Sequence, residues 1–288
     1  MLRIRTYILV MLCICILILI GTSIIALSRR EHYSPEPEFV TKTYMLDVID
    51  KSPFFNNMSP VDLVARKADS AAEYKSIYKK HVIEFTNTEK RRLTQITKDF
   101  PHLQNIPWKF AKVSDKIENA YPHTLQDVII LPVSFFMKGD AKSIMATLVH
   151  EKIHVYQRLY PKETLALLTR LGFVQADPRH LPEEISRMRR NNPDIQGVFH
   201  FNNTISVQVY TSVRPASLAD SKTVLYDFKK GVVVDDNIYG RFIPYYINQK
   251  EHPYEIMAVL IPKILLGEQH KDDMFNTALE WCQEYIIK

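Results

Sequence analysis

Glycine is scarce in this sequence, at 7 of 288 residues. Loops that cradle phosphate groups need several glycines, because glycine alone adopts a positive φ at no steric cost. The tight turns of an all-β sandwich favour glycine for the same reason. The scarcity therefore argues against a glycine-rich nucleotide site and against a turn-dense β sandwich.

Cysteine is also rare. Two of the three cysteines, Cys13 and Cys15, lie in the first hydrophobic run, so Cys282 is the only one in the rest of the chain. A lone cysteine cannot form an intramolecular disulfide. We therefore expect the fold to depend on its hydrophobic core and on any metal that it binds.

The sequence has no basic patch interleaved with aromatic residues, which a nucleic-acid-binding surface requires. Its net charge of +5 is modest, and 46% of its residues are hydrophobic, as in an ordinary globular protein. We expect no nucleic-acid partner. The length suits one sizeable domain with an appendage.

Residues 7–27 carry no charge. As a helix they would span about 30 Å, the thickness of a bilayer's hydrocarbon core. The apolar run is longer than that of a cleaved signal peptide. We predict a flank at 1–6, a single transmembrane helix at 7–27 and hence a membrane protein with the lipid bilayer as a partner. Arginines flank both ends of the run, and the free N-terminal amine slightly favours an extracytoplasmic body.

The chain after the apolar run divides into a stalk and one domain. Residues 28–52 are polar and contain two prolines, which predicts a stalk, and residues 53–288 are expected to form the domain. Ser59-Pro60 predicts the start of a helix that extends to about residue 85. A second helix is expected at 88–100.

The remaining pattern mixes strands and helices. The alternation at 108–113 predicts a strand with one buried face, and the continuous apolar run 128–131 predicts a fully buried strand. Further helices are expected at 142–158, 162–171, 252–266 and 272–287, with a β hairpin across 198–210. The fold class is α+β: a small sheet, a central helix and a mainly helical C-terminal half, with a cleft between the halves.

The helix predicted at 142–158 contains His150-Glu151-Lys152-Ile153-His154. Histidines at positions i and i+4 lie on one helical face, so both imidazoles can bind one zinc ion. Glu151 lies beside the first histidine, where its carboxylate can take a proton from a water that the metal activates. The pattern predicts His150 and His154 as metal ligands and Glu151 as the catalytic base.

The residues around this motif resemble the zincin superfamily of zinc metallopeptidases. Thr147 and the apolar residues next to the histidines fit the extended zincin pattern, whereas Lys152 stands at a position that is normally uncharged. The resemblance covers this helix and implies a peptidase with zinc as cofactor and a peptide or protein as substrate. It also implies that the strand near residues 118–124 lines the cleft and pairs with extended peptide, although a surface loop is equally compatible with that segment.

A catalytic zinc ion needs a third protein ligand. The metzincin subclass is excluded, because Gln157 and Tyr160 stand where its glycine and histidine would be. Glu255, at the start of the helix predicted at 252–266, resembles the glutamate ligand of gluzincins and is the favoured third ligand. The alternatives are Asp236, His180 and His200.

The sequence thus predicts a membrane-anchored zinc metallohydrolase, with a peptidase favoured. An amidase acting on non-peptide amides and a non-catalytic tethered binding or structural protein are the alternatives. The donor that stabilises the oxyanion of the reaction stays open among four residues, and residues 190–194 are interpreted as a turn. The four candidates are His200, Tyr210, Arg214 and Tyr239.

Overall fold

The computed structural model describes residues 36–98, 100–137, 139–234 and 252–287. The predicted membrane helix at 7–27 lies outside these ranges, as do Asp236 and Tyr239. Within the described ranges, no helix combines the length and the apolar character that a bilayer crossing requires. The predicted bilayer contact therefore stays a prediction.

A mixed five-stranded sheet forms the centre of the N-terminal half. Strand β5 (Val128–Pro132) lies between β3 (Lys109–Val113), which is parallel to it, and β4 (His123–Leu125), which is antiparallel. Strands β1 (Glu38–Phe39) and β2 (Val82–Ile83) also pair with β3. Strand β4 is consequently an edge strand of this sheet.

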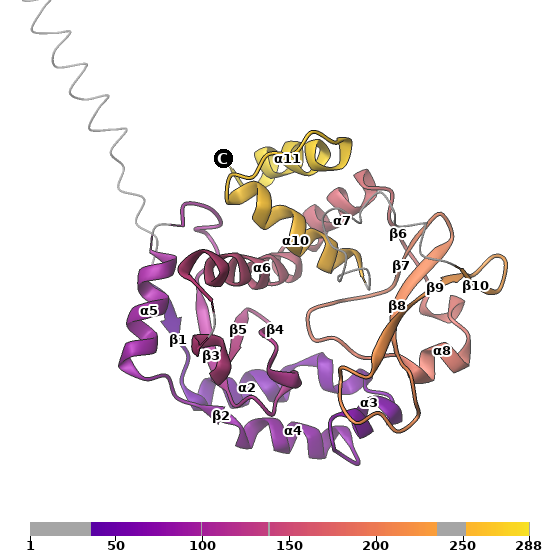
Figure 1. The fold of residues 1–288 in the computed structure, drawn as a ribbon, viewed down its shortest axis with the longest axis horizontal. Coiled ribbons are helices and arrows are strands. Elements are labelled where there is room, and N and C mark those ends of the chain that lie inside the picture. Colours follow the sequence, from indigo (N-terminus) through magenta and orange to yellow (C-terminus); the bar gives the residue numbers. More distant parts are fainter. Residues whose placement is uncertain (1–35, 99, 138, 235–251, 288) are drawn as a thin grey trace, which may run out of the picture. The chain divides into compact units, whose positions relative to one another are not determined.

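Both faces of β5 are buried, as its continuous apolar run predicts. Ile129 and Leu131 pack in the core that includes helix α6 (Ala141–Leu159). Val128 and Ile130 pack in a second core on the opposite face. Figure 1 shows α6 on one side of the sheet and helices α2 (Lys42–Lys51) and α4 (Ala71–Lys80) on the other.

The prediction of one buried face for β3 is wrong. Phe110 and Ala111 face opposite cores, and both are buried. Lys112 is also buried, at 6% exposure, and its Nζ lies 2.7 Å from Glu89 Oε2. A paired lysine therefore occupies a position that its polarity assigned to the surface.

The predicted stalk at 28–52 is wrong from residue 36 onward. Helix α2 (Lys42–Lys51) begins after Thr41, whose side chain accepts a hydrogen bond from the backbone of Tyr44. Its residues Met45, Val48 and Ile49 are buried beneath the sheet. Helical spacing of three apolar residues thus outweighs the polar composition that indicated a linker. The folded unit begins at Glu36.

The helix predicted to run from Pro60 to about residue 85 is two helices. Ser59 caps α3 (Pro60–Ala65), as its sequence predicts, but Ser70 caps a separate helix α4 (Ala71–Lys80). Lys67 has a φ of 58° between them, which breaks the helix. Helix α5 (Asn87–Thr97) follows at about the predicted position.

A second, antiparallel sheet lies in the C-terminal half, which the sequence predicted to be mainly helical. Its order is β10-β9-β8-β7-β6. The hairpin of β7 and β8 is confirmed, with Asn202 and Asn203 at φ values of 50° and 65° in its turn. The bounds of the strands are Val174–Gln175 for β6, Phe199–Phe201 for β7, Thr204–Tyr210 for β8, Ser221–Asp227 for β9 and Val232–Val234 for β10.

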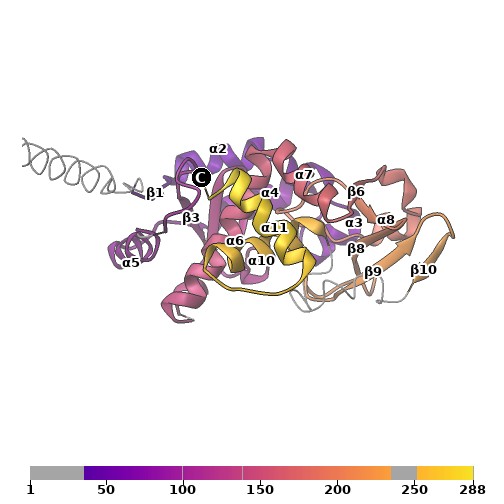
Figure 2. The same cartoon turned by 90° about the horizontal axis from the view of Figure 1, so that it is seen from above.

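Helices pack around α6 on the face that does not contact the sheet. Helix α10 (Pro253–Leu265) lies against α6, and α11 (Asp273–Tyr285) packs on α10 and α7 (Pro161–Arg170). The second sheet lies to the side of the α6–α10 pair in both views (Figures 1 and 2). Helix α8 (Glu183–Met188) and short 3₁₀ helices complete the described fold; the latter are η1 (Pro53–Asn57), η2 (Glu118–Ala120), η3 (Val133–Met137) and η4 (Pro178–His180).

Candidate metal centre

Helix α6 presents His150 and His154 on one face, one turn apart. The helix is anchored by Leu148, Val149 and Ile153, which are completely buried between the sheet and α10. The side chain of His154 is fully buried, whereas that of His150 is 20% exposed. One imidazole is therefore enclosed by protein, and the other borders solvent.

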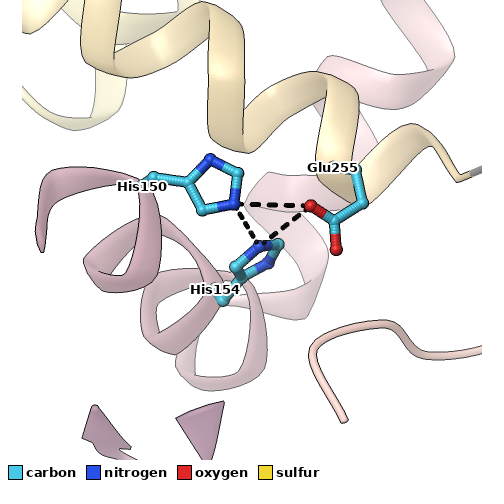
Figure 3. A group of neighbouring side chains, drawn as sticks. All are labelled: His150, His154 and Glu255. Carbon is cyan, nitrogen blue, oxygen red and sulfur yellow. Dashed lines mark hydrogen bonds and ion pairs between the residues drawn. The ribbon is translucent and has the colours of Figure 1, made fainter. Parts of the chain in front are cut away.

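Glu255, in the first turn of α10, completes a group of three side chains (Figure 3). Its Oε2 lies 3.4 Å from His150 Nε2 and 3.5 Å from His154 Nε2. The two Nε2 atoms are 3.1 Å apart. Two helices that are distant in the sequence thus bring two imidazoles and one carboxylate together, as the motif and the favoured third ligand predict.

The spacing of these atoms fits a tetrahedral metal ion. Ligands at 2.0–2.1 Å from a tetrahedral zinc ion lie about 3.3 Å from one another. The three measured separations, 3.1, 3.4 and 3.5 Å, bracket that value. Among the described residues, His150, His154 and Glu255 are the group that could hold a metal ion. Three protein donors leave the fourth tetrahedral position open.

Gln157 orients the imidazole of His154. The Gln157 Nε2 atom donates to the carbonyl oxygen of Tyr254 at 2.9 Å, so its Oε1 faces His154 Nδ1, also at 2.9 Å. An amide oxygen only accepts, so Nδ1 carries a hydrogen, and Nε2 of the neutral imidazole would be the nitrogen that binds a metal. The same amide connects α6 to the start of α10. From the sequence, Gln157 served only to exclude the metzincin subclass, and this orienting role was not predicted.

Asn192 orients the carboxylate of Glu255. Its Nδ2 donates to Glu255 Oε1 at 3.0 Å, which leaves Oε2 directed at the histidines. The backbone N–H of Asp194 donates to Asn192 Oδ1 at 2.9 Å and so selects the amide orientation. Residues 190–194, interpreted from sequence as a simple turn, therefore support the site. An asparagine in a turn gives no sequence signal for such a role.

Asp194 connects this segment to the edge strand β4. Its Oδ1 accepts a hydrogen bond from the backbone N–H of Thr124 at 2.7 Å. Arg158 Nη2 lies 3.6 Å from the same oxygen and donates to the Pro193 carbonyl at 2.6 Å. The segment is thus attached to α6 on one side and to β4 on the other.

The Glu151 carboxylate is buried beside the three ligands, at 4% exposure, and its Oε2 has no hydrogen-bond partner among the described residues. Burial raises the pKa of Glu151 well above its usual value, and the charge of Asp194 raises it further. A carboxyl group in these surroundings binds a proton more readily than one in water. It is therefore suited to accept a proton in the cleft.

The charges of the three grouped side chains support one another. Burial opposes ionisation of Glu255, but His154 and His150 outweigh it and lower the pKa of the carboxyl well below its usual value. Burial likewise opposes protonation of His154, but Glu255 and Asp194 outweigh it and raise the pKa to about 9. The cluster therefore attracts positive charge at its centre.

Lys152, which departs from the zincin pattern, lies away from the grouped ligands. Its Nζ is 3.8 Å from the centroid of the Trp108 ring, and the residue is 2% exposed. Burial lowers its pKa to about 7. Lys152 therefore departs from the zincin pattern without placing its ammonium group among the grouped ligands.

The other described candidates lie elsewhere. The rings of His180 and His200 lie 4.5 and 5.2 Å from that of Phe228, and neither histidine joins the group around Glu255. Tyr210 donates to Asp62 at 2.6 Å, and Arg214 is exposed. None of these residues lines the cleft at the metal centre. Asp236 and Tyr239 lie outside the described residues.

A cleft of about 770 Å³ opens on the metal centre. His150, Glu151 and Glu255 line it on one side, Tyr121 and His123 from the β4 region on another. A larger cavity of about 1090 Å³ lies on the other side of the Asn191–Pro193 segment, and none of the three grouped ligands or Glu151 lines it. The 770 Å³ cleft is therefore the candidate site, because the grouped side chains His150 and Glu255 line it together with Glu151, although it is the smaller of the two.

Comparisons with models of protein families, with curated proteins and with solved structures find no match to this chain. What is shown is therefore an α+β fold with a buried His150, His154 and Glu255 group that is consistent with a metal site.

Proposed function

We propose that this chain is a membrane-anchored zinc metallohydrolase that cleaves amide bonds, with a peptide or protein as the favoured substrate. The observation that carries the proposal is the convergence of His150, His154 and Glu255 beside the buried carboxylate of Glu151. The apolar run 7–27 is the proposed anchor.

Two imidazole nitrogens and one carboxylate oxygen, with a fourth position open to the cleft, are the donor set of a catalytic zinc site. His154 and Glu255 would bind the ion with the atoms that Gln157 and Asn192 leave directed inward. When bound, zinc would supply a Lewis acid that polarises a carbonyl and lowers the pKa of a water in the cleft.

Glu151 is the proposed proton acceptor. Its unpaired Oε2 can accept the proton of the attacking water and then pass it to the leaving amine. Burial raises the pKa of the carboxyl group above its usual value, which favours its acceptance of a proton. His150, the more exposed ligand, lies at the mouth of the cleft, where substrate would enter.

Metal content tests the proposal directly. The full chain would be purified in detergent, and bound metals would be measured by mass spectrometry for the wild type, His150→Ala and Glu255→Ala. We expect about one zinc per chain in the wild type and a large loss in both variants. His270→Ala, which removes a histidine outside the group, serves as the matched control. Equal zinc in all four proteins would remove the site.

A further inference from the structure

The outer edge of β4 is already occupied by the protein itself. In an antiparallel strand the backbone groups that face outward belong to alternate residues, here Thr124 within β4 and Pro122 just before the strand. Thr124 N–H donates to Asp194, and Thr124 carbonyl oxygen accepts from Arg158 Nη2 at 3.4 Å. Pro122 has no N–H to offer. An extended peptide therefore finds no free N–H on this edge at either residue, contrary to what the zincin resemblance implies.

Arg190 lines the same cleft as the metal centre. Its backbone N–H donates to the carbonyl of Gln208 at 2.8 Å, which attaches the residue to strand β8. Its Nε is buried and has no hydrogen-bond partner among the described residues. Lys263, another cation that lines the cleft, is paired with Glu268 at 3.0 Å.

A half-buried guanidinium with an unpaired N–H favours an anionic ligand. A buried donor left without an acceptor costs free energy, and a carboxylate satisfies a guanidinium with two parallel hydrogen bonds. The planar fork of arginine suits a carboxylate better than the point charge of lysine. Leu218, Ala258 and Val259 offer apolar contacts in the cleft, beside polar residues such as Gln208 and Ser221.

We propose that Arg190 binds a carboxylate of the substrate, so that the site selects short amides carrying an anionic group over neutral extended polypeptides. This inference rests on the proposed function and specifies its substrate class. The volume of about 770 Å³ suits a ligand of a few residues. The carboxylate comes either from a peptide C-terminus or from an acidic side chain.

Matched peptide libraries test the inference. The zinc-loaded full chain would be assayed on N-acetylated tetrapeptides with free C-terminal carboxylates, on the same peptides as C-terminal amides, and on amides that contain aspartate or glutamate. We expect kcat/KM to be about 10- to 100-fold higher for one of the two carboxylate-bearing libraries than for the neutral amides. The preferred library identifies the source of the carboxylate.

Substitutions test whether Arg190 causes the preference for carboxylate-bearing peptides. Arg190→Gln should remove the difference between acids and amides, and Arg190→Lys should keep part of it. Arg187→Gln, on an exposed residue of α8, is the matched control and should keep all of it. A wild-type enzyme that cleaves neutral amides equally well, or an unchanged preference in Arg190→Gln, overturns the inference.

A binding measurement separates this inference from the proposed function. Calorimetry on Glu151→Gln protein compares the affinities of acid and amide libraries without turnover. If the acids bind more tightly than the amides and Arg190→Gln abolishes this difference, the inference is supported. That holds even if the protein hydrolyses none of the peptides, a result that would contradict only the proposed enzymatic function. Equal affinities overturn it. A lower melting temperature of Arg190→Gln with an unchanged acid preference would instead assign Arg190 a structural role beside Asn191, whose backbone N–H donates to Asp62.

Discussion

Two of the buried charged clusters in the described part of the chain differ in how their charges are satisfied. In the Arg66 cluster, the guanidinium bonds to Asp62, to both oxygens of Glu118 and to the carbonyl of Asn191. In the candidate metal-centre cluster, two histidine nitrogens and a carboxylate oxygen face one another, and Glu151 Oε2 has no hydrogen-bond partner in the described ranges. Burial of charge is common to both clusters.

The comparison teaches which buried charges indicate chemistry. Arg66 is surrounded by acceptors and connects α3, η2 and the segment before Asp194, which is a structural task. The grouped ligands instead direct several electron pairs at one point next to a cleft. Protein groups alone satisfy the charges of the Arg66 cluster, whereas a bound cation would satisfy those of the grouped histidines and Glu255.

The largest expected effect is that of a substitution at Glu151 on the proposed hydrolysis. Glu151→Gln should lower kcat by about 10²- to 10⁴-fold, because it removes the proposed proton acceptor. Zinc content should stay near the wild-type value, because Glu151 is not among the grouped ligands. Assays of peptide hydrolysis together with metal analysis check this. Unchanged turnover would refute the assigned base.

Breaking the Arg66 cluster should affect stability instead. Arg66→Met leaves the buried Asp62 and Glu118 without their cation, which should lower the free energy of unfolding by about 3–5 kcal/mol. Urea denaturation followed by circular dichroism measures the loss. Zinc bound per folded molecule should not change. A parallel loss of zinc from folded protein would show that the two clusters are coupled.

A substitution at Gln157, which contacts the proposed ligand His154, should have an intermediate effect on zinc affinity. Gln157→Leu removes the acceptor of His154 Nδ1 and the bond to the Tyr254 carbonyl. Zinc affinity should fall about 10- to 100-fold, as for other residues that orient metal ligands. Competition with a fluorescent chelator measures it, and Gln104→Leu, outside the group, is the control. Equal affinities would exclude an orienting role.

The ion pair between Glu89 and Lys112 should give the smallest effect. Burial raises the pKa of Glu89, but bonds from Lys112 and from Thr86 outweigh it and lower the pKa below its usual value. A lowered folded-state pKa stabilises the fold above the unfolded pKa, and the contribution disappears as pH falls through the folded pKa. Glu89→Gln should therefore cost about 0.5–1 kcal/mol at pH 7 and less at pH 3, which is below the usual pKa of glutamate. Urea denaturation at both pH values checks this, and a constant difference would contradict it.

The sequence predicted those parts of the fold that depend on neighbours along the chain. Three predictions were correct because hydrogen bonds between residues close in sequence decide them. They are the helix cap at Ser59, the hairpin turn at Asn202-Asn203 and the helix around His150. Helix α2 was missed because its three buried residues become a core only against the sheet. The burial of Lys112 was missed because its partner Glu89 lies in another element.

The sequence by itself determined that His150 and His154 share one face of a helix with Glu151 beside them, since helical periodicity is local. Tertiary structure alone decided that Glu255 faces them and that Gln157, Asn192 and Asp194 orient the group. The bond between Gln157 and Tyr254 spans 97 positions. Contacts over such separations follow from how α6, α10 and the Asn191–Asp194 segment pack, and no pattern of neighbouring residues encodes them.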